Sequence, residues 1–478
     1  MKLSDADGKT DKILPLKRKL NHRRNHKGWK GYKQIHFVGI AGIGMSGVAR
    51  VLVDMGYKVS GSDLRETRLT KQMQDLGARI FVGHAESNIR GADAVIVSSA
   101  IPEDNPEIVA ARACGVPVLQ RAEMLGYLMG GRVGIAVAGT HGKTTTTSMI
   151  SLILEKNGLD PTVVIGGELS DFGANAKLGK GRYLVAEADE SDASFLKLRP
   201  KMAIVTNIDA DVNLGTGPFS TFHFDYQLTM NRVVEVFVEF LSKIPAEHGC
   251  AVLCVDDEQI RRILPRLKGR LISYGFNEEA DFSARDITLK EHCASATISY
   301  CGRDLGRLEL SVPGLHNIQN AMAATAIGLQ VGLSFENVRE ALRNFGGALR
   351  RFQVLGEADG ILVVDDYAHN PAKIRATLQA ARSGYDRRII AVFQPHRYTR
   401  TKFLKDEFIS AFSNADITIV TEIYSAGECP LVGVSADLLA EGIRNREKER
   451  EVLFIPTKEE ILRYLLSRLE PNDLVLTL

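Results

Sequence analysis

The segment GIAVAGTHGKTTTTSMI, residues 134–150, has the order of a strand, a glycine-rich turn and a helix. In phosphate-binding loops of this order, backbone N–H groups hold phosphate, a lysine neutralises its charge and a threonine ligates Mg²⁺. Lys143 and Thr144 occupy those two positions, although Val137 stands where the full pattern has glycine. We therefore predict a nucleotide-phosphate site, with a chance GKT in a strand–helix turn as the alternative. The predicted phosphate cradle consists of Gly139, Thr140, His141, Gly142, Lys143, Thr144 and Thr145.

Acidic side chains follow two apolar segments downstream of this loop. The segment YLVAEADESD ends in Glu187, Asp189, Glu190 and Asp192, and AIVTNIDAD ends in Asp209 and Asp211. Because the carboxyl ends of parallel strands meet at the ligand crevice, these carboxylates could approach Mg²⁺. Glu187 is the preferred metal ligand, while we expect most of Asp189, Glu190 and Asp192 to form a solvated acidic loop.

Another glycine loop lies nearer the N-terminus. The strand-like run QIHFVGI leads into GIGMSG, residues 42–47, and then into a helical pattern, which is the context that a GxGxxG loop requires. Its glycines let the backbone approach a pyrophosphate, and Asp63 stands where such folds place an acid on a ribose. The pattern alone leaves three interpretations: a nicotinamide dinucleotide, another diphosphate such as a UDP sugar, or a structural turn.

These residues must be positioned by a chain that alternates short β-rich runs with helical patterns, which predicts βαβ units and parallel sheets. Three series open at QIHFVG, GIAVAG and GILVVDDYAHNP. Between residues 281 and 310, alternating runs predict a small antiparallel appendage, followed by a helix pair over 317–331 and 335–345. The expected fold class is α/β, with a Rossmann-like N-terminal domain, a P-loop ATPase-type central domain with a parallel sheet, and a Rossmann-like C-terminal domain.

The expected domains are residues 33–131, 132–348 and 349–478, preceded by a basic segment over residues 1–32. The basic segment lacks helical or strand periodicity, so we favour a disordered tail over a segment that binds an anionic surface. No low-complexity segment separates the domains.

The composition of the chain excludes several classes of protein but does not identify a binding partner. The 478 residues carry a net charge of +2, which indicates no general attraction to nucleic acid or membrane. No apolar run approaches the length that spans a bilayer, and the N-terminus lacks the apolar core of a signal peptide. The six cysteines have no CxxC spacing, which argues against a zinc site or a disulfide framework. We expect a cytoplasmic protein that is a monomer or a homodimer.

Motifs from about Lys33 to the end of the chain resemble the Mur ligase family, which adds amino acids to the bacterial cell-wall precursor. GTHGKTTT, EADESDASF, VTNIDAD, PGLHNIQNAMAA, RRF, VVDDYAHNP and FQPHRYTRT occur in the family's order. GIAGIGMSGVA, SSAI, RAEMLGYLM and EIYSAGE resemble the branch that joins L-alanine to UDP-N-acetylmuramate. The resemblance implies that ATP phosphorylates the muramoyl carboxylate, that the amine of alanine attacks the acyl phosphate, and that Mg²⁺, Lys143 and arginines neutralise the charge.

The resemblance also implies roles for residues around ATP. Thr144, Glu187 and His223 would ligate the metal, and His141 would face the substrate unless it is only a structural loop histidine. His316, Asn317 and Asn320 would approach the adenine, and Arg351 and Asp366 would reach the nucleotide. A helix N-cap role is the alternative for Asn317.

For the sugar nucleotide and the alanine, the resemblance implies binding residues in the N-terminal and C-terminal domains. The resemblance places Gly42, Gly44, Met45 and Ser46 around the UDP diphosphate and Asp63 near the nucleoside, with Ser99 and Arg121 as weaker additions. In the third domain, Tyr367, His369, His396 and Tyr398 would face the cleft. Arg397 or Arg400 would hold the alanine carboxylate, with ordinary surface salt bridges as the alternative.

The chain departs from the family pattern in three places. Residues 212–222, VNLGTGPFSTF, separate Asp211 from His223, and removing them would restore the family's DADH run. We interpret them as an insertion at the active-site mouth that either leaves His223 able to reach the metal or displaces it. Asn370 replaces a common histidine, and the chain stops at DLVLTL, where the family continues into a further turn and helix. We expect that last departure to affect stability rather than chemistry.

Three functional alternatives remain beside alanine ligation. A related ligase that recycles muropeptides shares most of the central motifs. An NAD-dependent oxidoreductase accounts for GxGxxG but leaves the phosphate loop unexplained. A nucleotide-binding protein without turnover is expected if the insertion at 212–222 has destroyed the metal site.

Overall fold

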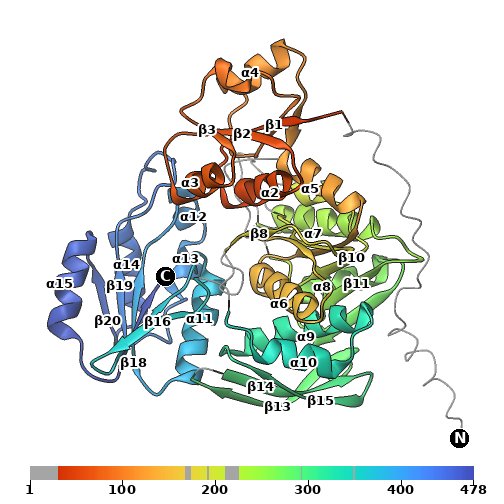
Figure 1. Ribbon diagram of the computed structural model, residues 1–478. Helices are drawn as coiled ribbons and strands as arrows, with labels where there is room; N and C mark the ends of the chain where they lie inside the picture. The colour runs from red at the N-terminus through yellow and green to blue at the C-terminus, as the bar shows by residue number, and fades with distance from the viewer. Residues whose placement is uncertain (1–30, 167–173, 191–192, 210–225, 292, 348–349) are drawn as a thin grey trace, which may run out of the picture.

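The computed structural model describes residues 31–166, 174–190, 193–209, 226–291, 293–347 and 350–478. Within them, the strands form three sheets of five, ten and six strands, which are successive in the chain (Figure 1). Helices flank the three sheets, so the α/β class and the three-domain architecture are confirmed. The insertion at 212–222, His223 and nearly all of the basic segment lie outside the described residues.

The N-terminal sheet is parallel throughout, in the order β3-β2-β1-β4-β5. The order reverses between β1 and β4, where open α/β sheets bind their ligands. The GIGMSG loop follows β1 and opens α2, so it lies at this point. The strands are β1 (Gln34–Val38), β2 (Lys58–Asp63), β3 (Arg79–Val82), β4 (Ala94–Val97) and β5 (Val118–Gln120), and the helices are α2 (Ile43–Asp54), α3 (Arg68–Asp75), α4 (Pro106–Ala113) and α5 (Arg121–Gly130).

The central sheet has the order β15-β14-β13-β12-β11-β10-β6-β9-β7-β8. It is parallel from β7 to β13. The strands of its parallel part from β7 to β11 are almost wholly buried, as expected for a sheet covered on both faces. The predicted antiparallel appendage is β13 to β15, which continues this sheet through a short parallel pairing with β12. The strands are β6 (Val133–Ala138), β7 (Thr162–Val164), β8 (Ala176–Lys177), β9 (Tyr183–Glu187), β10 (Met202–Val205), β11 (Cys250–Cys254), β12 (Leu271–Gly275), β13 (Phe282–Lys290), β14 (Cys293–Tyr300) and β15 (Arg303–Leu310).

Two helices of the central domain are buried on nearly every side because they pack against each other as well as the sheet. These are α6 (Lys143–Lys156), which begins at the phosphate loop, and α9 (Leu315–Gln330). The predicted helix pair is confirmed, although α9 begins two residues before the predicted start at Asn317. The other helices are α7 (Tyr226–Ser242), α8 (Glu258–Ile263) and α10 (Phe335–Arg343).

The C-terminal sheet has the order β16-β17-β21-β18-β19-β20, with only the β16–β17 pair antiparallel. The run DLVLTL forms β21, which pairs with β17 on one side and β18 on the other. The strands are β16 (Gln353–Ala358), β17 (Ile361–Asp365), β18 (Arg388–Phe393), β19 (Ile417–Val420), β20 (Glu451–Phe454) and β21 (Asp473–Thr477). The helices are α11 (Pro371–Gly384), α12 (Tyr398–Phe403), α13 (Lys405–Ile409), α14 (Ala436–Arg446) and α15 (Lys458–Arg468).

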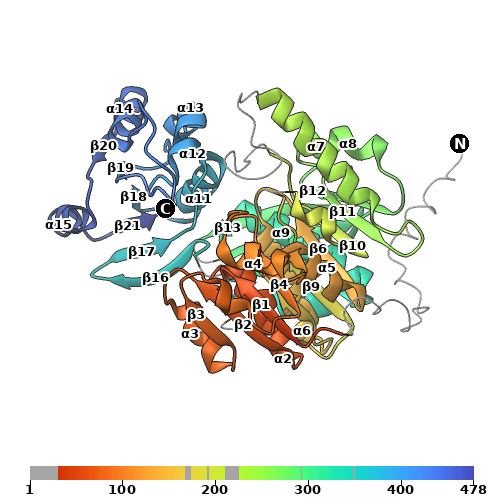
Figure 2. The same ribbon diagram turned by 90° about the horizontal axis from the view of Figure 1, so that it is seen from above.

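The first two domains share one apolar core, whereas the third has its own. Met45, Leu125 and Met129 of the N-terminal domain belong to the same buried cluster as Ile135 and Phe195 of the central domain. A separate cluster fills the C-terminal domain. Figure 2 shows this third unit beside the other two, with α11 on the side that faces them. No helix among the described residues is both long and apolar enough to cross a membrane.

Candidate active site

Two glycines in left-handed conformations shape the turn between β6 and α6. Gly139 has φ +125° and Gly142, the N-cap of α6, has φ +80°. A Cβ on Gly142 would lie 2.6 Å from Asn320 Oδ1, and one on Gly139 would collide with Thr206 Oγ1, so neither position accepts a side chain. No side chain caps α6, so the N–H groups of its first turn can bind phosphate.

Residues that follow the neighbouring strand β10 form hydrogen bonds to the turn between β6 and α6. Asn207 Oδ1 accepts the His141 backbone N–H at 2.8 Å, and Thr206 Oγ1 donates to the His141 carbonyl at 2.5 Å. The Thr140 hydroxyl accepts the Asp209 N–H at 3.0 Å, while the His141 ring lies 3.8 Å from the Asp209 carboxylate. Sequence reasoning did not assign Thr206 or Asn207 to the site, although both lie in the motif VTNIDAD.

Lys143 is already paired within the protein. Its ammonium donates to both carboxylate oxygens of Glu190, at 2.7 and 2.8 Å, and to the Gly139 carbonyl at 2.5 Å. Burial raises the pKa of Glu190 to about 6, although the charge of Lys143 opposes the shift. Burial alone would lower the pKa of Lys143, but Glu190 and Asp189 outweigh it and raise that pKa. The expectation of a solvated carboxylate is therefore wrong for Glu190.

Asp189, unlike Glu190, fits the expectation of a solvated acidic side chain after β9. Its side chain is 45% exposed and lies 3.7 Å from the Arg121 guanidinium. Asp192 lies outside the described residues.

The side chains of Glu187 and Thr144 suit a divalent cation. Glu187 Oε1 is buried and has no hydrogen-bond partner among the described residues, while Thr144 hydrogen-bonds the same carboxylate. Burial raises the pKa of Glu187, although Lys143 and Thr144 oppose this effect. Carboxylate and hydroxyl oxygens are the ligands that Mg²⁺ prefers. Within the described ranges, no three His, Cys, Asp or Glu side chains form a metal cluster, and His223 lies outside those ranges.

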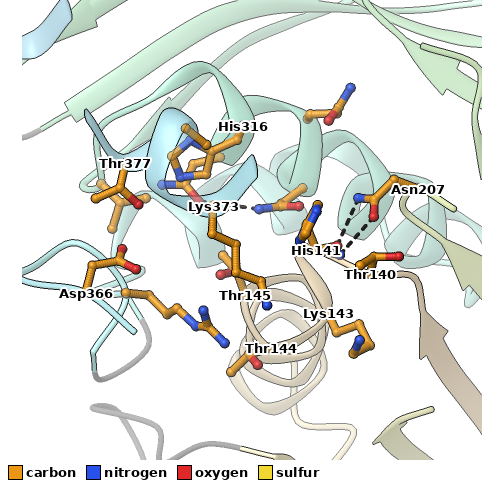
Figure 3. Close-up of a pocket in the computed structure, with 18 of the residues that line it drawn as sticks. Thr140, His141, Lys143, Thr144, Thr145, Asn207, His316, Asp366, Lys373 and Thr377 are labelled. Carbon is orange, nitrogen blue, oxygen red and sulfur yellow. Dashed lines mark hydrogen bonds between the residues drawn. The ribbon is translucent and has the colours of Figure 1, made fainter. Parts of the chain in front are cut away.

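A cavity of about 360 Å³ extends from the phosphate loop to the C-terminal domain (Figure 3). It holds most of the predicted nucleotide residues: Thr140, His141, Gly142, Lys143, Thr144, Thr145, Glu187, His316, Asn317, Asn320, Arg351 and Asp366. Burial lowers the pKa of His316 to about 4, so its imidazole is neutral at neutral pH. The cavity also contains Lys373 and Thr377 of α11, which sequence reasoning did not select because they lie in an ordinary amphipathic helix pattern.

The N-cap alternative for Asn317 is wrong. Gly314, with φ +97°, is the N-cap of α9, and Asn317 lies in the first turn of that helix. The Asn317 side chain donates to the Pro313 carbonyl at 2.6 Å. Asn320 Oδ1 accepts from Thr146 at 3.2 Å, so the Asn320 amide connects α9 to α6 beside the nucleotide cavity.

A second cavity of about 330 Å³ lies between the first glycine loop and the central domain. Gly42, Gly44, Met45 and Arg121 line it on the N-terminal side. A Cβ on Gly44 would lie 2.8 Å from the Arg121 guanidinium, so glycine here lets the arginine lie across the loop. The two cavities have Lys143, Glu187 and Gly166 in common. A ligand of each loop would therefore meet the other at Lys143 and Glu187.

Three predicted residues of the first domain do not line this cavity. The Ser46 hydroxyl is buried and bonded to the Ile43 carbonyl and to Asn175. The Asp63 carboxylate accepts a hydrogen bond from the backbone N–H of Ala41 at 2.9 Å, and this bond holds the start of the glycine loop in place. Ser99 is exposed, whereas its neighbour Ser98 lines the cavity.

Four rings form a row in the C-terminal domain. Centroid distances are 4.8 Å from Tyr367 to His369, 6.1 Å from His369 to His396, and 5.5 Å from His396 to Tyr424. Burial, aided by Arg400, lowers the pKa of His396 to about 4. Burial lowers the pKa of His369 well below its usual value. Both imidazoles are therefore neutral at neutral pH.

The two predicted carboxylate-binding arginines lie beside this row. Arg400 donates to His396 Nδ1 at 3.0 Å, whereas Arg397 lies 3.8 Å from Glu428. Arg397 Nε is buried without a hydrogen-bond partner among the described residues. Tyr398, between them, packs against the C-terminal core. The arginines thus have partners beside the ring row, and Arg397 retains an unpaired buried donor.

Three domain descriptions from one family match the chain in succession. They are "Mur ligase family, catalytic domain" over residues 34–132, "Mur ligase middle domain" over 137–328, and "Mur ligase, glutamate ligase domain" over 350–478. Together they cover most of the chain, in the order in which its sheets occur.

Similar proteins span nearly the same length. The chain is 50% identical over 446 residues to a protein named UDP-N-acetylmuramate--L-alanine ligase from Geotalea daltonii, covering 93% of this chain and 94% of that protein. A protein of the same name from Pelotomaculum thermopropionicum is 50% identical over 447 residues, with the same coverage of both chains. The crystal structure of UDP-N-acetylmuramate-alanine ligase MurC from Thermotoga maritima has a TM-score of 0.77 and 30% identity, covering 93% of this chain and 95% of that chain.

Proposed function

The chain belongs to the Mur ligase family, and we propose that this ATP-dependent ligase joins L-alanine to UDP-N-acetylmuramate in peptidoglycan precursor synthesis. The relatives named above supply the identity of the substrates. The observation that carries the proposal is the junction of the two cavities at Lys143 and Glu187. A nucleotide in one cavity and a sugar nucleotide in the other would meet at those side chains. The proposal places the reaction in the cytoplasm, where ATP is available.

The first step transfers phosphate from ATP to the muramoyl carboxylate, giving an acyl phosphate and ADP. The N–H groups at the start of α6 and the ammonium of Lys143 stabilise the charge on the transferring phosphate. Arg121, which lies across the first glycine loop, is suited to the diphosphate or carboxylate of the sugar nucleotide. Met45 and the loop glycines give the diphosphate access to the backbone.

Thr144 and Glu187 would hold Mg²⁺, with His223 as the third protein ligand that the family resemblance implies. The buried Oε1 of Glu187, which has no hydrogen-bond partner among the described residues, supports this assignment because a buried carboxylate oxygen without a donor favours a cation or a proton. The metal would neutralise the triphosphate and the carboxylate that approach each other.

The second step is attack of the alanine amine on the acyl phosphate. The amine loses a proton, a tetrahedral intermediate forms, and its collapse releases phosphate and leaves the amide. We assign the alanine carboxylate to Arg397 or Arg400, beside Tyr367, His369 and His396. The unpaired Nε of Arg397 supports its candidacy, because a buried guanidinium N–H favours an anionic partner. The separate core of the C-terminal domain is consistent with its moving as a unit toward ATP.

Phosphate release in the presence of ATP and Mg²⁺ tests the proposal. We expect release only when UDP-N-acetylmuramate and L-alanine are present together. Equal release with a preformed tripeptide in place of alanine would instead favour a muropeptide-recycling ligase. Nucleotide binding without any release would contradict catalysis and point to damage by the insertion at 212–222.

A further inference from the structure

Lys373 brings a cation of the C-terminal domain into the nucleotide cavity. It lies in the first turn of α11, on a helix face that also contributes Ala372, Ala376 and Thr377 to the cavity wall. The two alanines leave space for a ligand, so Lys373 is the charged residue of this face within the described cavity. Figure 3 shows its side chain leading from α11 into the pocket, on the side of Thr144 and Thr145.

His369 fixes the direction of this lysine. The Tyr367 carbonyl lies 2.9 Å from His369 Nδ1, and the Lys373 ammonium lies 3.3 Å from His369 Nε2. A carbonyl can only accept and an ammonium can only donate, so Nδ1 carries the proton and Nε2 accepts. The pKa of His369 is lowered by burial and then by Lys373, which keeps the ring neutral and able to act as that acceptor. An ammonium carries three donor protons, and the contact with His369 uses one of them.

The acidic side chains of the nucleotide cavity offset its other cations, so an additional cation would favour binding of a triphosphate. Lys143 is held by Glu190 through both carboxylate oxygens. Burial raises the pKa of the carboxyl groups of Glu187 and Asp366, and the nearby charge of Arg351 opposes that shift in both. A triphosphate that enters this space meets acidic side chains as well as the loop N–H groups, so a third cation opposite the loop favours its binding.

We propose that Lys373 binds the phosphate chain of the nucleoside triphosphate from the C-terminal side of the cavity, with His369 as the residue that positions it. This inference rests on the proposed function, because it takes ATP as the ligand of the cavity. It assigns to α11 a direct contact that makes nucleotide affinity depend on the C-terminal domain.

Equilibrium binding to the full-length chain tests the contact without turnover. Calorimetry would compare the imido analogue of ATP with adenosine, for the parent chain and for Lys373→Met, Lys373→Arg and Lys458→Met. We expect Lys373→Met to weaken analogue binding by about 10-fold or more, as for loss of a charge-assisted hydrogen bond, and to change adenosine binding by less than about twofold. Lys373→Arg retains the charge and should lose less. Lys458, in the first turn of α15 and outside the cavity, is the matched control and should bind both ligands normally.

A double-mutant cycle separates the positioning role of His369 from a general packing role. His369→Phe should weaken analogue binding by a few-fold in the parent chain but have little further effect in Lys373→Met. Additive losses would overturn the positioning role.

Two other outcomes would overturn the phosphate contact itself. Unchanged analogue binding by Lys373→Met, with normal binding by the parent, would overturn this inference alone. Equal losses for the analogue and adenosine would show a disturbed pocket rather than a phosphate contact. If the parent chain binds no analogue, the proposed function fails and this inference fails with it.

Discussion

The ammonium of Lys143 lies 2.7 and 2.8 Å from the two carboxylate oxygens of Glu190, so the cation expected to bind phosphate has an internal anionic partner. The side chains of this pair are only 17% and 12% exposed, which limits screening by water. A phosphate that reaches Lys143 must therefore compete with the carboxylate of Glu190.

This competition predicts a pH-dependent effect of Glu190→Gln on nucleotide binding. The pKa of Glu190 is raised to about 6, so above that pH the carboxylate is ionised and holds Lys143. At about pH 8 the variant should bind the imido analogue of ATP several-fold more tightly than the parent. At about pH 5 the Glu190 carboxyl group of the parent is mostly protonated and as neutral as the glutamine of the variant, so the two proteins should bind the analogue with similar affinity. Calorimetry at both pH values measures this, and protonation of the analogue affects both chains equally. Weaker binding by the variant at high pH would refute the competition.

Gly142→Ala should impair the phosphate loop for two separable reasons. The left-handed backbone strains any other residue by about 1–2 kcal/mol, and the added Cβ would lie 2.6 Å from Asn320 Oδ1. We expect analogue affinity to fall by at least about 10-fold. Gly158→Ala is the matched control, because Gly158 has φ +70° but open space around it. It should lower the unfolding free energy without changing nucleotide affinity. Equal affinity losses in the two variants would argue against the Asn320 contact.

Glu187→Gln should abolish the response to Mg²⁺ and make the metal-free protein more stable. The pKa of Glu187 is raised by burial, so in the folded state its ionisation is disfavoured. Stability of the parent therefore falls as pH rises from the unfolded-state pKa through the folded-state pKa, and the variant lacks this loss. Thermal unfolding at neutral pH, with the imido analogue and with or without Mg²⁺, measures both effects. Activity should fall by at least about 100-fold. An equal Mg²⁺-dependent rise in melting temperature for both proteins would contradict the ligand assignment.

Gly44→Ala should affect the sugar nucleotide and not ATP. Its added Cβ would lie 2.8 Å from the Arg121 guanidinium and displace that side chain from the second cavity. The KM for UDP-N-acetylmuramate should rise several-fold, while the KM for ATP stays unchanged. The fold should not suffer, because alanine is the better helix former by about 1 kcal/mol. Gly130→Ala, in α5 with open space around it, is the control. An unchanged KM for the sugar nucleotide would contradict a role for Arg121 in binding that substrate.

Local patterns allowed most of the fold and the phosphate loop to be predicted. Buried parallel strands are apolar throughout, so runs such as GIAVAG are visible in the sequence, and a left-handed glycine such as Gly142 leaves a clear signature. The short edge strand β8 and the exposed hairpin strand β16 have no such run and were not predicted. Their pairing depends on neighbouring strands rather than on their own composition.

Long-range contacts in the site left no local signal. Asn207 lies 66 positions from the His141 carbonyl that it binds, and Glu190 lies 47 positions from Lys143. The choice of Ser99 instead of Ser98 follows from side-chain direction, which changes with each residue at the end of a strand. Lys373 resembles any solvent-facing lysine of an amphipathic helix until α11 is placed against the cavity.

The most direct test of the account follows oxygen from substrate to phosphate. UDP-N-acetylmuramate labelled with heavy oxygen in its carboxylate would be incubated with the full-length chain, ATP, Mg²⁺ and L-alanine, and the released phosphate analysed by mass spectrometry. Formation of the acyl phosphate and attack by the amine transfer one carboxylate oxygen to phosphate, so we predict labelled phosphate in step with the alanine amide. Amide formation with unlabelled phosphate, or phosphate release without amide, would contradict ATP-driven ligation of alanine through an acyl phosphate.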